Sequence, residues 1–66
     1  MLLASSNTLE KLKALISKFY CGTKVALFEN YADGTYNVHN INGHIKGVIV
    51  RKVRGRFRFE MKGRSL

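Results

Sequence analysis

Residues 44–64 read HIKGVIVRKVRGRFRFEMKGR, and within them residues 56–62 alternate polar and apolar at every step. Successive side chains of a β-strand point to opposite faces, so this alternation predicts a strand. Phe57, Phe59 and Met61 would then share one face, which we expect to be buried because leaving them in water is costly. The other face would present charged side chains to solvent: Arg56, Arg58, Glu60 and Lys62.

A second strand is predicted just before this one. Val48-Ile49-Val50 is a run of β-branched residues, which is typical of an interior strand with both faces partly covered. Arg54-Gly55 separates the two runs, and glycine takes positive φ without steric cost, so we expect a tight hairpin with its tip at residues 52–56. Gly47 interrupts the earlier part of the first strand and indicates a bulge there.

An amphipathic helix is predicted near the N-terminus, over residues 8–20. Its apolar residues fall within a stripe about 140° wide at helical spacing. They are Leu9, Leu12, Leu15, Ile16, Phe19 and Tyr20. Asn7 and Glu10 match a capping box, and Gly22 suits the left-handed residue that ends a helix. Residues 1–6 would form a short arm before the helix.

The middle of the chain predicts two further strands, Lys24–Asn30 and Thr35–Asn40. Asp33-Gly34 and Asn42-Gly43 are strong hairpin signals. Short turns between consecutive strands favour an antiparallel meander. We therefore expect one small basic α+β domain over residues 1–66, with the helix packed on a three- to four-stranded antiparallel β-meander that spans residues 24–62.

The chain length and its single cysteine set further expectations. A domain of 66 residues has a thin core, and a homodimer is one way to add buried surface. Cys21 has no cysteine partner within the chain, which fits a cytoplasmic protein, and we expect it to be a buried small apolar residue at the helix end. We expect no signal peptide and no membrane association.

Positive charge is concentrated in residues 44–64. Eight of the twelve Lys and Arg residues fall there with one acid, Glu60, which gives +7 of the formal +8. Arginines interleaved with aromatic residues on a β-ribbon suit contact with a phosphate backbone, and DNA is the expected ligand. The predicted nucleic-acid-binding residues are Lys46, Arg51, Lys52, Arg54, Arg56, Arg58, Lys62 and Arg64.

Other interpretations of the same charge stay open. The charged ladder would also keep a small domain in solution and protect an edge strand, or bind an acidic protein that the chain inhibits or recruits. Asn37 and His39 would reach bases if the second strand joined the interface, whereas we assign Tyr36 to the core. The size and charge are typical of small regulatory proteins of phages, plasmids and bacteria.

Enzymatic and metal-dependent functions are not expected. Cys21, His39 and His44 are the only soft metal ligands, whereas a structural zinc site needs four. The chain has four acids, and local patterns assign three of them to other places: Glu10 to the helix cap, Asp33 to a turn and Glu60 to the arginine ladder. No phosphate-cradling glycine loop or Ser/His/Asp arrangement is present. We therefore expect a non-enzymatic binding protein without a cofactor.

Overall fold

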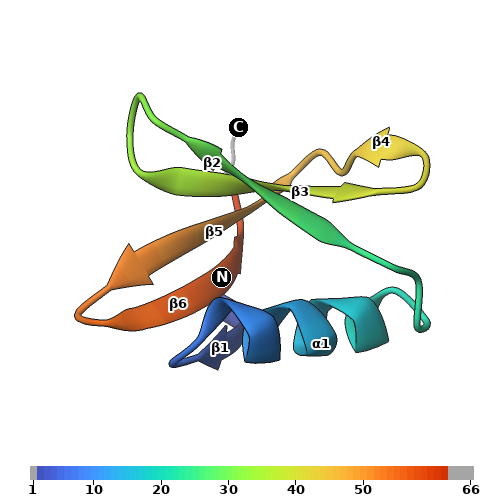
Figure 1. The fold of residues 1–66 in the computed structure, drawn as a ribbon, viewed down its shortest axis with the longest axis horizontal. Helices are drawn as coiled ribbons and strands as arrows, with labels where there is room; N and C mark the ends of the chain where they lie inside the picture. Colours follow the sequence, from blue (N-terminus) through green and yellow to red (C-terminus); the bar gives the residue numbers. More distant parts are fainter. Residues whose placement is uncertain (1, 63–66) are drawn as a thin grey trace.

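The computed structural model describes residues 2–62, which form one helix and six strands (Figure 1). In chain order these are β1 (Leu2–Ser6), α1 (Leu9–Phe19), β2 (Ala26–Asn30), β3 (Thr35–Asn40), β4 (Gly43–His44), β5 (Val48–Val53) and β6 (Arg56–Met61). The strands form one antiparallel sheet in the order β1-β6-β5-β3-β2, and the short β4 pairs with β3. The predicted α+β class is confirmed, but the three- to four-stranded meander is wrong.

The main correction is the first strand. Residues 2–6, which we expected to be an arm, form β1 and pair with β6, so that Ala4 lies opposite Phe59 and Ser6 lies opposite Phe57. The first and last strands of the described chain are therefore neighbours, which a meander does not allow. Local patterns do not reveal this pairing, because the partner strand lies about fifty residues further along the chain.

The basic hairpin of β5 and β6 has the predicted turn. Val53 pairs with Arg56, so Arg54 and Gly55 form a two-residue loop, and both have positive φ (53° and 79°). Positive φ at both positions is the signature of the type I′ turn, whose twist matches that of the flanking strands. The apolar face is buried only in part. Phe59 is fully buried and Phe57 half-buried, but Met61, at the end of its strand, is 46% exposed.

The remaining turns differ from the predictions in detail. A four-residue loop that contains Asp33-Gly34 joins β2 to β3, as predicted, and β3 has its predicted bounds. Asn40 pairs with Gly43, so the next turn consists of residues 41–42 rather than 42–43. Gly47 (φ 85°) lies in a turn between β4 and β5, which both pair with β3, and not at a bulge within a strand as predicted.

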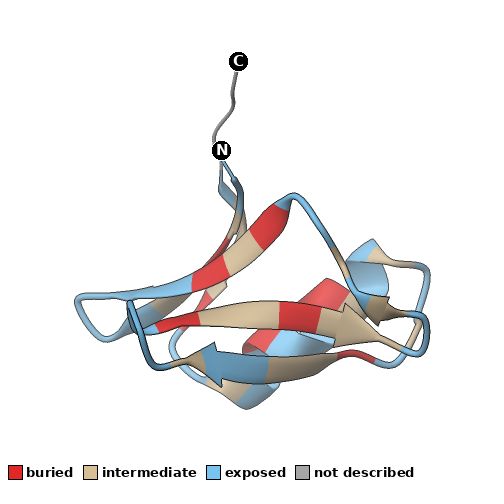
Figure 2. Cartoon of the chain, turned by 90° about the horizontal axis from the view of Figure 1, so that it is seen from above, coloured by how far each residue is buried: buried red, intermediate tan, exposed pale blue. Residues whose placement is uncertain are grey.

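The core lies between α1 and one face of the sheet, which we call the inner face; the opposite face is the outer face. The buried apolar residues, drawn red in Figure 2 together with two buried polar ones, come from α1, from three strands and from the residue before β2: Leu12, Ile16, Val25, Val38, Val48, Val50 and Phe59. The ring of Phe59 meets the rings of Phe19 and Tyr20 edge-on, with centroids 5.6 and 6.3 Å apart. The predicted helical stripe is therefore the packing surface, although Leu15 at its border is 42% exposed and Phe19, the last residue of the helix, is 54% exposed.

Both ends of the helix require corrections. The N-cap is Thr8, whose Oγ1 accepts a hydrogen bond from the backbone N–H of Lys11 at 3.2 Å, and not Asn7. Cys21 is exposed with φ 62°, followed by Gly22 with φ 82°. The chain reverses through this left-handed pair, so the side chain of Cys21 is not a core residue as we expected.

Replacing Thr8 by alanine tests the cap assignment. Loss of the N-cap acceptor should lower the free energy of unfolding by about 1 kcal/mol, measured by urea denaturation. Asn7→Ala is the matched control, because Asn7 is exposed and adjacent but does not cap the helix. A larger loss for Asn7→Ala than for Thr8→Ala would contradict the assignment.

The β2–β3 loop contributes a pH-dependent term to stability. Asp33 Oδ1 accepts hydrogen bonds from the hydroxyl and the backbone N–H of Thr35, at 2.7 and 3.1 Å, and these bonds hold the pKa of Asp33 below its usual value. A lowered pKa adds stability that is present above the unfolded-state pKa of about 3.9 and is lost as the pH falls through the folded-state pKa. Asp33→Asn should therefore make the unfolding free energy less dependent on pH below about pH 4.

The control for this prediction is Asn30→Ala. The Asn30 side chain accepts a hydrogen bond from Ala32 N–H at 3.1 Å in the same loop but carries no titrating group. Its loss should lower stability equally across the acid range. A pH dependence in Asp33→Asn identical to that of the unmodified protein would overturn the assignment.

Candidate nucleic-acid interface

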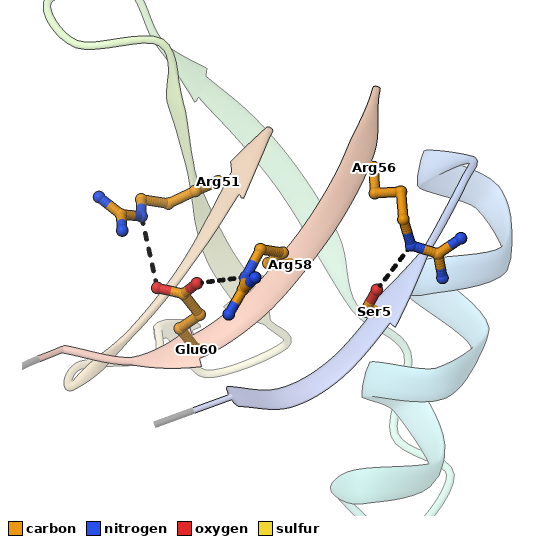
Figure 3. Close-up of polar contacts among 5 residues, drawn as sticks. All are labelled: Ser5, Arg51, Arg56, Arg58 and Glu60. Carbon is orange, nitrogen blue, oxygen red and sulfur yellow. Dashed lines mark hydrogen bonds and ion pairs between the residues drawn. The ribbon is translucent and has the colours of Figure 1, made fainter. Parts of the chain in front are cut away.

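Three arginines share the outer face of the β5–β6 hairpin. Burial of Phe59 on the inner face turns Arg56 and Arg58 outward, because side chains of a strand alternate between faces. Arg51 lies opposite Arg58 in the antiparallel pairing and therefore points to the same side. Figure 3 shows these three side chains with Arg58 between the other two, and we call them the arginine cluster: Arg51, Arg56 and Arg58.

One carboxylate connects two of the three guanidinium groups. Arg58 Nε donates a hydrogen bond to Glu60 Oε2 at 2.7 Å, and Arg51 Nε lies 3.3 Å from Glu60 Oε1 (Figure 3). The side chain of Glu60 is only 14% exposed, whereas those of Arg51 and Arg58 are 56% and 41% exposed. Each guanidinium carries five N–H donors, and these contacts are made through Nε, so donors on the Nη atoms remain for a ligand.

Arg56 is oriented by a third strand. Its Nε donates a hydrogen bond to Ser5 Oγ on β1 at 3.1 Å (Figure 3). The pairing of β1 with β6 therefore helps to orient a side chain of the candidate interface, in addition to completing the sheet. With one acid against three arginines, the cluster and Glu60 together carry a formal charge of +2.

The other predicted residues do not all join this cluster. Lys52 points to the inner-face side of the hairpin, where its Nζ lies 5.6 Å from the ring centroid of Phe57 in a cation–π arrangement. Arg54 occupies the turn, Lys46 lies between β4 and β5, and Lys62 directly follows β6; all three are exposed. Arg64 lies outside the described residues.

Arg51 lies between two shallow hollows of the surface. One, of about 310 Å³, brings Arg51 together with Glu60 and Lys62; the other, of about 340 Å³, places it beside Lys52 and Val53. Asp33 and Thr35 line both hollows. Lys62 and Lys52 therefore lie close to Arg51. Acidic residues line the same hollows, because Asp33 borders both of them and Glu60 borders one.

Sequence reasoning missed an exposed aromatic residue on the outer face. Phe28 on β2 is 56% exposed, and its ring centroid lies 4.7 Å from that of His39 on β3. His39 in turn lies 5.2 Å from His44 on β4, with the two rings tilted by 33°. We call these three residues the aromatic cluster. The sequence does contain an indication of this exposure. Leu27 and Phe28 are adjacent in a strand, so one of the two must face outward.

Within residues 2–62, no three His, Cys, Asp or Glu side chains lie close enough together to hold a metal ion. In the same part of the chain, no helix is both long and apolar enough to cross a bilayer. Comparisons of the chain with protein-family models, curated protein sequences and solved structures gave no match.

Glu60→Gln tests whether this carboxylate holds the cluster together. Without its charge, Arg51 and Arg58 face each other across two strands as like charges, which destabilises a cross-strand pair. We expect the unfolding free energy to fall by about 1 kcal/mol at low salt, and the loss to shrink at about 0.5 M salt as the repulsion is screened.

Glu29→Gln is the matched control, because it removes the same charge from an exposed position on β2. It should change stability by less than about 0.5 kcal/mol at either salt concentration. Equal losses in the two variants, or a loss in Glu60→Gln that salt does not reduce, would show that Glu60 has no such role.

Proposed function

We propose that the protein is a non-enzymatic nucleic-acid-binding protein that contacts phosphates through the arginine cluster. The observation that carries the proposal is the placement of Arg51, Arg56 and Arg58 on one face, each with its Nε engaged by another side chain. Contacts of this kind restrict the guanidinium groups before a ligand arrives, which lowers the entropic cost of binding. Arginine suits phosphate because its planar fork donates two parallel hydrogen bonds.

The distribution of charge supports the same function. The formal charge of +8 on 66 residues attracts polyanions over long range, and residues 44–64 of the sequence carry +7 of it. Phosphate contacts supply affinity and position the protein but do not select a sequence. Binding should therefore be strong at low salt and should weaken steeply as salt displaces the protein from the backbone.

A salt titration with labelled DNA and RNA measures this dependence. The three arginines, together with Lys52 and Lys62 beside Arg51, would contact about five phosphates. This number predicts a slope of log K against log salt near −4 to −5 on duplex DNA and near −3.5 on a single strand. Arg56→Gln combined with Arg58→Gln removes two contacts, so it should weaken binding and make the slope shallower by about 2.

Lys11→Gln combined with Lys13→Gln is the matched control. Both lysines are exposed on α1, which packs on the inner face, opposite to the arginine cluster, and the change in net charge is identical. If the two double variants weaken binding equally, the arginine cluster contributes only its share of the net charge, and the proposal is contradicted. Binding without a salt slope would also contradict it, and an acidic protein would then be the partner to test.

A further inference from the structure

The aromatic cluster lies on the same face of the sheet as the arginine cluster. Phe28 pairs with Asn37 across β2 and β3, and His39 pairs with His44 across β3 and β4. The inner-face residues Tyr36 and Val50 pair across β3 and β5, so the residues that alternate with them point outward on both strands. Two strand spacings, or roughly 10 Å, therefore separate β2 from β5 across this face.

The three rings of the aromatic cluster lie outside the buried core. Phe28 is more than half exposed, although Leu27 beside it packs against the core, and the ring of Phe28 meets the ring of His39 edge-on. His44 is also exposed. An exposed phenylalanine next to two imidazole rings offers flat apolar surface at the border of a positively charged face.

A shallow cavity adjoins the cluster. It has a volume of about 270 Å³ and is lined by Lys24, Val25, Ala26, His39, Asn40 and Ile41. Most of this lining is apolar, and the polar residues Lys24 and Asn40 are among those that border it. Apolar walls with a few polar groups suit a flat heterocycle that needs both stacking and edge recognition.

We infer that the aromatic cluster stacks on unpaired bases, so that the ligand of the outer face is single-stranded nucleic acid. This inference rests on the proposed function, since the arginine cluster would hold the phosphates of the same strand. The two clusters are complementary to such a strand, with rings for its bases and guanidinium groups for its backbone. In a duplex the base faces are covered by neighbouring bases, and the rings would have nothing to stack on.

An abasic oligonucleotide provides the decisive probe. It has the phosphates of a normal single strand but no bases, so the ratio of the two affinities measures what the bases contribute. Fluorescence anisotropy at a fixed salt concentration would compare a labelled 12-nucleotide strand, its abasic analogue and the corresponding duplex. We expect the normal strand to bind roughly 5- to 100-fold more tightly than the abasic strand for each stacked base.

Phe28→Ala combined with His39→Ala should remove this advantage. The variant should bind the normal strand almost as weakly as the abasic strand, and its affinity for the abasic strand should be unchanged. Phe19→Ala is the control for loss of a similarly exposed ring elsewhere: Phe19 is 54% exposed against 56% for Phe28, but it lies on the helix, which packs on the inner face. Because the Phe19 ring also contacts Phe59, the affinities are compared at a temperature at which both variants are folded. Thermal unfolding of each variant checks that the fold is retained.

The outcomes separate this inference from the proposed function. Equal affinity for normal and abasic strands, with binding still lost in Arg56→Gln/Arg58→Gln, would overturn base stacking and leave phosphate binding in place. Tighter binding to the duplex than to the single strand would also overturn it. Failure of all three probes to bind at low salt would overturn both proposals together.

Discussion

Burial of Phe59 beneath α1 is the constraint on which the rest of the structure depends. Phe59 is fully buried, faces Val50 on β5 and Ala4 on β1, and receives the edges of two helix rings. A strand has a side-chain period of two, so a shift of one residue would move the charged row of β6 into the core. The burial of this one ring therefore also makes Arg56, Arg58 and Glu60 point outward. It fixes the register of the strands on either side as well.

Much of the local structure could be predicted because it depends on local chemistry. The Arg54-Gly55 turn and the bounds of β3 follow from turn residues and alternation within a few positions. Strand β1 could not be predicted, since Leu2–Ser6 has no alternating pattern and its partner lies at the other end of the chain. The N-cap is Thr8 and not the predicted Asn7. Either side chain can accept the hydrogen bond, and the exact start of the helix depends on how β1 leads into it.

The candidate site was predictable as a set of charges but not as a geometry. A two-residue turn at Arg54-Gly55 places Arg51 opposite Arg58, so this contact follows from the sequence once the turn length is known. The bridging position of Glu60 also requires side-chain conformations, which the pattern of residues does not contain. The aromatic cluster depends on a turn at residues 41–42, and a shift of one residue in that turn would have separated His39 from His44.

The placement of Glu60 explains why arginine rather than lysine occupies positions 51 and 58. A carboxylate between two cations lowers the net charge by one, which by itself would weaken attraction to a polyanion. A guanidinium, however, can bond the carboxylate through Nε and still present its Nη donors, whereas an ammonium must use its one charged nitrogen for both partners. Glu60 therefore relieves the repulsion between two neighbouring cations and restricts their side chains while leaving donors for a ligand.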